Sequence, residues 1–209
     1  MKLYNSDIQS NPRRVRMFLA EKELTLDTID IDIFSGGQFS PEFKNKSPLW
    51  DIPLLELDNG QCITQVNAIC RYLETLYPTP PLFGTTAQEQ AQVEMWNHIA
   101  FINGMQAIAE VARNSMPVFE GRALLGAHSF DQIPALAERG QQRMRTFMLD
   151  INHRLSEEKF LAGTEFSVAD ITAFVAIDLA LSNGIEQPSE CSSLSEWLTK
   201  MRSRPSASA

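Results

Sequence analysis

The segment Ile52–Glu74, with the sequence IPLLELDNGQCITQVNAICRYLE, decides the fold of this chain. Its first apolar run is followed by Asn59-Gly60, a pair that favours a tight hairpin turn, because both central residues of a type I′ turn need positive φ. Apolar side chains then repeat at helical spacing, at Val66, Ile69, Cys70 and Leu73. The segment therefore predicts a strand, a turn, a second strand and a helix.

The residues before and around this segment alternate short strand patterns with helical ones. We expect strands at Lys2–Tyr4, Thr28–Asp32, Leu54–Leu57 and Cys62–Ile63. The pair Asn11-Pro12 is typical of the cap and first residue of a helix. Together the patterns predict the order β-α-β-α-β-β-α, which is that of a thioredoxin-like domain.

A change of pattern follows at three prolines, Pro78, Pro80 and Pro81, which cannot continue a helix. We expect an α/β domain at residues 1–79, a linker at 80–88 and an all-helical domain at 89–209. The segment Gln88–Ser115 is apolar over a wide face, which predicts burial against its own domain and against a partner subunit.

Composition excludes several classes of function. The formal net charge is -8, which argues against nucleic-acid binding, because phosphate recognition needs clustered Lys and Arg. No apolar run approaches the ~20 residues of a membrane span, and no secretory signal is present, so we expect a cytoplasmic protein. The three cysteines lack metal or disulfide spacing, and the three histidines are scattered, so no metal site is expected.

Ser167 and Asp170 form an S-x-x-D pattern before an apolar run. In a capping box the Ser side chain caps a helix amide while the acid at the third helical position reaches back to the cap. We therefore interpret this pair as a folding element rather than as catalytic residues.

The quoted segment resembles the glutathione-binding half of the glutathione S-transferases. The resemblance extends over nearly the whole chain, through Lys2–Tyr4, Phe160–Gly163, Phe166–Ile171 and Trp197–Pro205. It is strongest for bacterial and fungal members in which no obvious catalytic tyrosine follows the first strand. It implies a thioredoxin-like α/β domain plus an all-α domain, glutathione as co-substrate, a homodimer and a role in detoxification.

The resemblance also implies a glutathione site. The bond before Pro53 is expected to be cis and to expose the backbone of Ile52 to the cysteinyl part of glutathione. Gln65 and Val66 are expected to hold its γ-glutamyl end, although Val66 replaces the serine of many relatives. A lost hydrogen bond to a charged group lowers affinity by about 10- to 150-fold, so we expect weakened binding. Trp50 is expected either to wall this pocket or to cover its own loop.

The family activates the glutathione thiol just after the first strand, where this sequence has Ser10 and Asn11. Each is a candidate donor to the sulfur; the alternatives are a loop serine and a helix cap. Arg13 and Arg14 lie in the expected first turn, where cations oppose the helix dipole. An anion is therefore expected beside them, either glutathione, which makes Arg13 a glutathione-binding candidate, or a neighbouring carboxylate.

The family binds electrophiles between its two domains. The matching candidates here are the residues Asn5–Gln9 and, at the end of the long helical segment, Arg113 and Asn114. Either of the last two could hold a water against the sulfur, and the alternative is that both are solvated residues of a helix end.

Two functions follow from the resemblance. The first is a glutathione transferase that activates the thiol for attack on small hydrophobic electrophiles. The second is a non-catalytic interaction protein with a degenerate glutathione site, similar in kind to the stringent starvation proteins. A thiol-disulfide oxidoreductase with its own reactive cysteine is excluded, because no cysteine follows the first strand.

Overall fold

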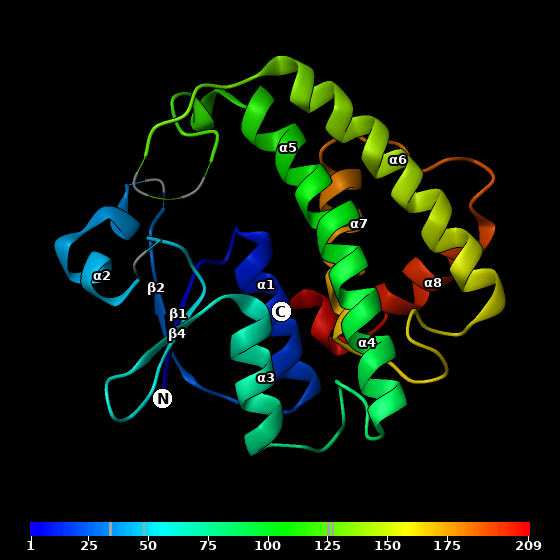
Figure 1. Ribbon diagram of the computed structural model, residues 1–209, viewed down its shortest axis with the longest axis horizontal. Helices are drawn as coiled ribbons and strands as arrows, with labels where there is room; N and C mark the ends of the chain where they lie inside the picture. Colours follow the sequence, from blue (N-terminus) through cyan, green and yellow to red (C-terminus); the bar gives the residue numbers. More distant parts are fainter. Residues whose placement is uncertain (34, 48, 125, 127) are drawn as a thin grey trace.

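The computed structural model describes residues 1–33, 35–47, 49–124, 126 and 128–209. Four strands form one mixed sheet in the order β2-β1-β3-β4 (Figure 1). β1 pairs parallel with β2 and antiparallel with β3, and β3 pairs antiparallel with β4. The strands are β1 (Lys2–Asn5), β2 (Asp27–Asp30), β3 (Leu54–Glu56) and β4 (Cys62–Thr64). The expected order of elements along the chain, β-α-β-α-β-β-α, is confirmed.

The side chains of β1 and β3 alternate between the two faces of the sheet, and each face packs against different helices. Leu3 and Leu55 are paired across the two strands and belong to the main core. That core also contains the buried faces of α1 (Ser10–Glu21) and α3 (Val66–Leu76). The neighbouring Tyr4 and Leu54 point to the opposite face, because successive strand side chains alternate. There they form a smaller cluster with Phe43 and Ile52, and Phe43 belongs to α2 (Pro41–Lys46).

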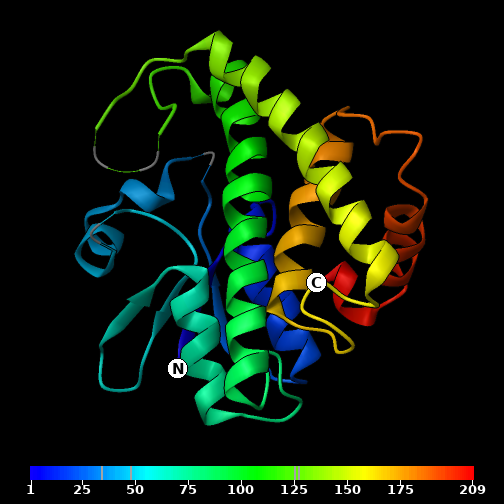
Figure 2. The ribbon, with the colours of Figure 1, turned by 45° about the vertical axis from the view of Figure 1, so that its right-hand side comes forward.

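The rest of the chain is built from helices around a central helix, α7 (Figure 2). α7 is buried along most of its length, which explains why it is apolar on all sides. Short segments η1 (Gly37–Phe39), η3 (Pro117–Phe119) and η4 (Pro205–Ser208) lie between or after the longer elements. The helices are α4 (Ala87–Ile99), α5 (Gln106–Ser115), α6 (Pro134–Glu157), α7 (Val168–Ser182) and α8 (Ser192–Arg202).

The long apolar segment expected at 88–115 forms one rod, in which the π-helical η2 (Ala100–Met105) joins α4 to α5. Two glycines let other helices approach this rod closely. A Cβ on Gly104 would lie 2.7 Å from Phe147 Cε1, and a Cβ on Gly140 would lie 2.7 Å from the Ala107 carbonyl oxygen. Met95 remains 44% exposed, so part of the apolar face is uncovered in a single chain.

Polar contacts tie the connection between the α/β part and the helices to α1 and α3. The buried Lys22 Nζ donates to the carbonyl oxygens of Tyr77 and Pro80, at 2.8 and 2.5 Å. Its ion pair with Glu74 of α3 measures 2.5 Å, and Glu74 in turn accepts from the Leu82 amide at 3.0 Å. The connection is therefore fixed against the α/β part. The division of the chain at residues 79 and 89 stays a prediction.

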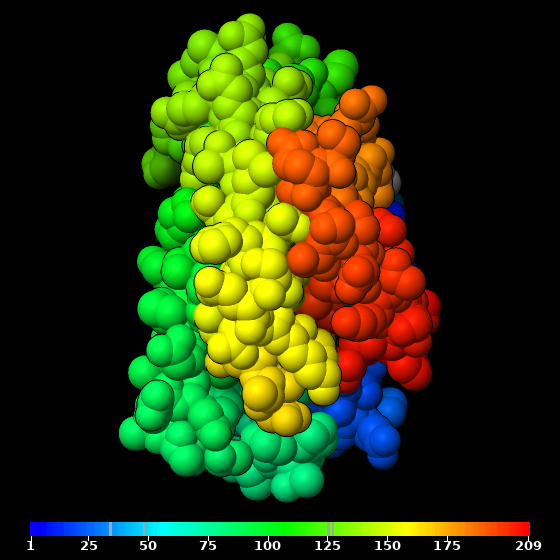
Figure 3. Space-filling view, turned by 90° about the vertical axis from the view of Figure 1, so that its right-hand side faces the viewer, coloured from blue at the N-terminus to red at the C-terminus, as the bar shows by residue number. Residues whose placement is uncertain are grey.

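The end of the chain returns to α1. Figure 3 shows α8 beside α6, where the Leu194 amide donates to Asn152 Oδ1 at 3.1 Å. After α8, Arg204 makes two hydrogen bonds of 2.7 Å to Glu21 at the end of α1. Ser206 donates to the same carboxylate. These contacts place η4 against α1.

The capping box at the start of α7 is present. Asp170 Oδ2 accepts from the Ser167 amide at 3.0 Å and from its hydroxyl at 3.1 Å, while Oδ1 accepts from the Leu161 amide at 3.0 Å. Burial raises the pKa of Asp170 to about 6, although these hydrogen bonds favour its ionised form. The pair stabilises the central helix, as the sequence predicts.

The variant Ser167→Ala should lower the free energy of unfolding by about 1 kcal/mol, because it removes the side-chain half of the capping box. Chemical denaturation measures this change. Ser192→Ala is the matched control, because Ser192 is an exposed serine in the first turn of α8, where substitutions usually change stability by less than about 0.5 kcal/mol. Equal effects of the two substitutions would contradict the assignment.

Candidate functional site

α1 begins earlier than the sequence indicates. The helix starts at Ser10 with Gln9 as its cap, and the Arg13 amide donates to the Gln9 carbonyl oxygen at 3.1 Å. The expected start at Asn11-Pro12 is therefore wrong. Pro12 fits in the first turn, because the first four amides of a helix have no intrahelical acceptor. Ser10 thus stands, half-buried, at the start of the helix, while Asn11 lies within its first turn.

Asn11 and Arg14 belong to a buried polar junction. The Asn11 Oδ1 accepts from Arg14 Nη1 at 3.3 Å. Arg14 also donates to Thr172 Oγ1, at 2.8 and 3.1 Å, and to Asn67 Oδ1 at 3.2 Å. Its side chain is only 3% exposed, and burial lowers its pKa to about 10. The three acceptor atoms are neutral oxygens, so hydrogen bonds rather than an ion pair hold this cation.

The same junction extends into the helical part of the chain. Thr172 of α7 donates to Asn97 Oδ1 at 2.7 Å, and Asn97 of α4 donates to Asn67 Oδ1 at 3.1 Å. Asn67 lies in the first turn of α3, directly after Gln65 and Val66. The junction therefore fixes the starts of α1 and α3, the two candidate glutathione-binding elements, relative to each other.

Arg13 has a neighbouring carboxylate, which is the second of the two alternatives considered for it. Its Nη1 donates to Asp178 of α7 at 2.8 Å, and its Nη2 donates to the Ala207 carbonyl oxygen at 3.0 Å. Its guanidinium also lies 5.4 Å from the centre of the Phe174 ring. Arg13 therefore joins α1 to α7 and η4, and its role toward glutathione stays a prediction.

The cis bond that the resemblance implies is present directly before β3, and a second backbone feature lies between β4 and α3. The Ile52–Pro53 bond is cis, and Gln65 at the start of α3 has a φ of 73°. The Gln65 side chain donates to Asp51 Oδ2 at 2.6 Å, and Asp51 Oδ1 accepts from Ser47 at 2.8 Å. Sequence reasoning missed Asp51, a carboxylate held beside the start of α3.

Val66 is the first residue of α3 and is 8% exposed. Its side chain belongs to the main core, so the position that carries a hydroxyl in many relatives supplies packing here.

Trp50 packs against its own part of the chain. Its ring meets Phe39 edge-on at 5.7 Å, and Lys44 Nζ lies 4.1 Å from its centre. From the helical part, Arg122 lies 5.2 Å from the Phe39 ring. These contacts favour the interpretation of Trp50 as a cover for its loop.

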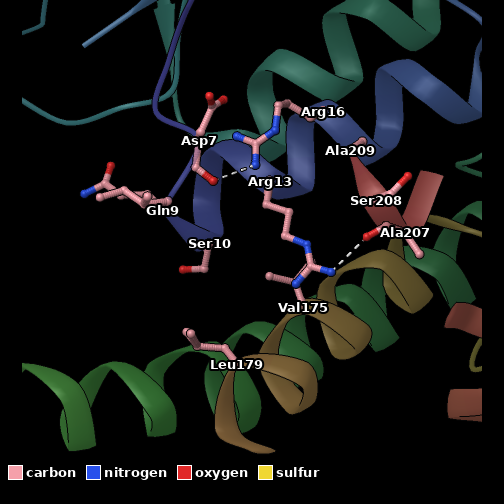
Figure 4. Close-up of a pocket in the computed structure, with 11 residues that line it drawn as sticks. Asp7, Gln9, Ser10, Arg13, Arg16, Val175, Leu179, Ala207, Ser208 and Ala209 are labelled. Atoms are coloured by element: carbon pink, nitrogen blue, oxygen red, sulfur yellow. Dashed lines mark hydrogen bonds between the residues drawn. The ribbon is translucent and has the colours of Figure 1, made fainter. Parts of the chain in front are cut away.

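A cavity of about 330 Å³ opens at the start of α1 (Figure 4). Ser10, Arg13 and Arg16 line it from α1, at successive i, i+3 spacing, and Ala207–Ala209 form another side. Val175 and Leu179 of α7 complete an apolar wall. The spacing of the α1 residues is visible in the sequence. The two α7 residues carry no such signal, because they lie in a helix that is apolar throughout.

Arg113 and Asn114 do not line this cavity. Asn114 donates to the Glu110 carbonyl oxygen at 2.9 Å and accepts from the Ile133 amide at 3.0 Å. It therefore connects α5 to the start of α6. Burial lowers the pKa of Arg113, whose guanidinium lies 5.2 Å from the Phe119 ring. Both side chains are engaged at the helix end rather than simply solvated, and their role toward an electrophile stays a prediction.

Among the described residues, no group of three or more His, Cys, Asp or Glu is arranged to hold a metal ion. In the same part of the chain, no helix is both long and apolar enough to span a membrane.

Comparison with known proteins identifies the family of this chain. Residues 10–76 match the model of the glutathione S-transferase N-terminal domain, and residues 123–205 match that of the C-terminal domain. The chain belongs to the glutathione S-transferase family.

Similar members of the glutathione S-transferase family span the whole chain. Glutathione S-transferase 2 of Saccharomyces cerevisiae is 28% identical, over 99% of this chain and 87% of the yeast protein. A crystal structure of a glutathione S-transferase domain-containing protein from Marinobacter aquaeolei is 32% identical, with a TM-score of 0.91 and 99% of both chains covered. A Gtt2-class glutathione S-transferase of Vibrio parahaemolyticus is 31% identical, with a TM-score of 0.84 over 99% of this chain and 94% of that structure.

Thr172→Val should destabilise the protein by about 2 to 3 kcal/mol, because the buried Arg14 loses one of its three acceptors and a hydrogen bond to a charged group is removed. Thermal and chemical unfolding measure the loss. Thr146→Val is the matched control, since Thr146 is exposed on α6 and its hydroxyl donates only to the Gln142 carbonyl oxygen. If both variants lose the same stability, the buried junction is not the cause.

Proposed function

We propose that this protein is a glutathione transferase that activates the glutathione thiol for attack on small hydrophobic electrophiles. Family membership supports the use of glutathione as co-substrate. The observation that carries the proposal is Ser10, which stands at the start of α1 and lines a cavity of about 330 Å³. A thiol brought to this point meets both a hydroxyl donor and space for a second substrate.

The start of α1 suits the activation of a thiol. The thiolate is the reactive form, and a helix amino terminus favours negative charge through its unpaired amides and its dipole. Ser10 is the better of the two candidate donors, because Ser10 lines the cavity and Asn11 does not. The activated sulfur forms a bond to the electrophilic carbon, and the electron pair displaced from that carbon leaves with the departing group or is taken up by a conjugated acceptor.

The glutathione backbone would bind between the cis-proline connection and α3. In this arrangement Ile52, before the cis Pro53, meets the cysteinyl part, and the Val66 amide donates to the glutamyl carboxylate. The Gln65 side chain donates to Asp51. The charge of Asp51, beside Gln65, would attract the glutamyl ammonium group. This arrangement retains the main partners of glutathione but lacks the hydroxyl at position 66.

We infer further that the protein is a cytoplasmic homodimer with a role in detoxification. The exposed apolar residues Leu76 and Met95 support an interface over α3 and α4, since they are 47% and 44% exposed in the single chain. Light scattering should give about twice the 23.5 kDa of one chain, and a mass near one chain would reject the dimer.

A non-catalytic interaction protein is the second candidate. It is favoured by the side chain of Val66, which cannot donate, and by Gln65, whose amide is already bound to Asp51. The two functions differ in one measurable property, the affinity for glutathione.

Calorimetric titration should show saturable binding of reduced glutathione in the micromolar to millimolar range. Val66→Ser should tighten it by about 10- to 150-fold, because the hydroxyl restores a hydrogen bond to a charged group. Val66→Ala is the matched control, since it removes similar packing without adding a hydroxyl. Absence of binding to both reduced and oxidised glutathione would favour the interaction protein. A preference for the oxidised form would favour disulfide reduction.

Ser10→Ala should raise the pH at which conjugation is half-maximal by about 1 to 2 pH units. A donor to the thiolate lowers the thiol pKa, and the loss of a hydrogen bond to a charged group corresponds to a pKa change of this size. The pH profile of kcat/KM measures it. Ser208→Ala is the control, because Ser208 lines the same cavity and donates to the Pro205 carbonyl oxygen. An unmoved profile for Ser10→Ala would exclude Ser10 as the sulfur donor.

A further inference from the structure

The cavity at the start of α1 contains an arginine held only by neutral acceptors. Arg16 Nη1 donates to Asn5 Oδ1 at 2.8 Å and to the Ser6 carbonyl oxygen at 2.9 Å, and Nη2 donates to the Asp7 carbonyl oxygen at 3.1 Å. Asp7 also lines the cavity, and its Oδ1 accepts from the Asn5 side-chain Nδ2 at 2.9 Å. The positive charge of Arg16 is therefore attracted by Asp7 without being paired to it.

The charge of Arg13 is also balanced only in part. Its partner Asp178 accepts from Arg13 at 2.8 Å through one oxygen and from Arg202 at 3.2 Å through the other. Two guanidinium groups thus share one carboxylate. Figure 4 shows Arg13 extending from α1 toward Val175 and Ala207, across the cavity wall.

Arg13 and Arg16 act on each other. Burial lowers the pKa of Arg16, the carboxylate of Asp7 opposes this change, the nearby charge of Arg13 lowers the pKa further, and the carboxylate of Asp30 opposes it as well. Two cations that repel each other beside one cavity are stabilised when an anion binds between or beside them. Among the described residues that line the cavity, Asp7 supplies the one acidic side chain beside these two arginines.

Part of the remaining wall is apolar, although Gln9 and Ser208 also contribute to the lining. Ile8 is 59% exposed on the loop before α1, and Val175 and Leu179 line the side formed by α7. A volume of about 330 Å³ lies at the lower end of ordinary small-molecule pockets. The cavity therefore offers space for a small ring on one side and a positive field on the other.

Helix geometry sets the spacing between these features. Arg13 and Arg16 follow Ser10 by three and six residues, which corresponds to about 4.5 and 9 Å along the helix axis at 1.5 Å per residue. These are spacings of the backbone positions, and the Arg13 side chain extends from its position to Asp178 and Ala207.

We propose that this cavity binds the electrophile, and that the electrophile is a small aromatic or unsaturated carboxylic acid whose carboxylate is bound by Arg13 and Arg16. The reactive carbon then faces the glutathione sulfur at Ser10, and the apolar body lies against Val175 and Leu179. This inference rests on the proposed function and deepens it, because it names the substrate class.

An aryl chloride acid provides a balanced reaction for the test. The thiolate sulfur forms a bond to the ring carbon, the carbon–chlorine bond breaks, and chlorine leaves as chloride with the bonding electron pair. The thiol proton goes to solvent, and no further reactant is needed. The probes are 4-chloro-3-nitrobenzoate and the neutral 4-chloro-3-nitrobenzamide, which have the same reactive carbon and nearly the same size.

For each probe, kcat/KM is divided by the rate constant of the uncatalysed reaction with glutathione. The wild-type protein should favour the benzoate by about tenfold or more, as expected for a hydrogen-bonded ion pair. Arg13→Gln and Arg16→Gln should each reduce this preference severalfold, through a higher KM for the benzoate, and Arg16→Lys should retain part of it. Arg202→Gln is the matched control, because it removes a positive charge from the same Asp178 pair, and Arg202 does not line the cavity.

Three outcomes overturn the inference. Equal acceleration of the two probes would leave the transferase function intact and reject the substrate class. A loss of preference in Arg202→Gln as large as in Arg13→Gln would assign the effect to overall charge. A higher KM for glutathione with both probes, at unchanged preference, would show that the bound anion is glutathione itself. If the glutamine variants fail to fold, the wild-type protein can be tested by inhibition of its conjugation of 1-chloro-2,4-dinitrobenzene. In this assay 3-nitrobenzoate should inhibit more strongly than 3-nitrobenzamide. Equal inhibition by the two compounds would reject the proposal.

Absence of reaction with both probes, together with absence of glutathione binding, would reject the proposed function and this inference together. Reaction with the benzamide distinguishes failure of the proposed function from failure of this inference. It supports the transferase function whether or not the protein prefers the benzoate.

Discussion

The buried guanidinium of Arg14 is the interaction on which the arrangement of this protein depends. It hydrogen-bonds to residues of α1, α3 and α7, and through Asn97 the same network reaches α4. A buried charge is costly unless its hydrogen bonds are made. A shift of these helices relative to one another would therefore expose the Arg14 guanidinium to solvent or leave it buried without its hydrogen-bond acceptors. The network places the starts of α1 and α3 in one fixed relation, which is what a two-part glutathione site requires.

α1 serves a different purpose on each of its faces. Its apolar face, including Val15 and Phe18, packs in the main core. Arg14 points into the polar junction, while Ser10, Arg13 and Arg16 border the cavity. At its end, Glu21 and Lys22 hold the tail of the chain and the connection to the helical part. One helix thus connects the sheet, the candidate site and the returning chain end.

Much of the fold could be predicted, because its signals are local. The Asn59-Gly60 turn, the strand alternation and the Ser167–Asp170 box each depend on residues close together in sequence. The start of α1 was predicted wrongly, because Asn11-Pro12 is a strong local cap signal. The helix extends two residues further toward the amino terminus, where the Gln9 carbonyl oxygen accepts from the Arg13 amide. The candidate site was predicted only in part: Ser10 and Arg13 do line one cavity, whereas Asn114 joins α5 to α6.

The sequence by itself determined the elements, their order and the family, because hydrophobic periodicity, turn residues and capping boxes act over a few residues. Only the tertiary structure decided which charges meet. Arg14 finds its acceptors on helices far away in the chain, Arg13 finds Asp178, and Arg16 remains without a paired carboxylate beside Ser10. The physical reason is that electrostatic interactions and cavities depend on distances in space, and residues 165 positions apart come within 2.8 Å only once the helices have packed.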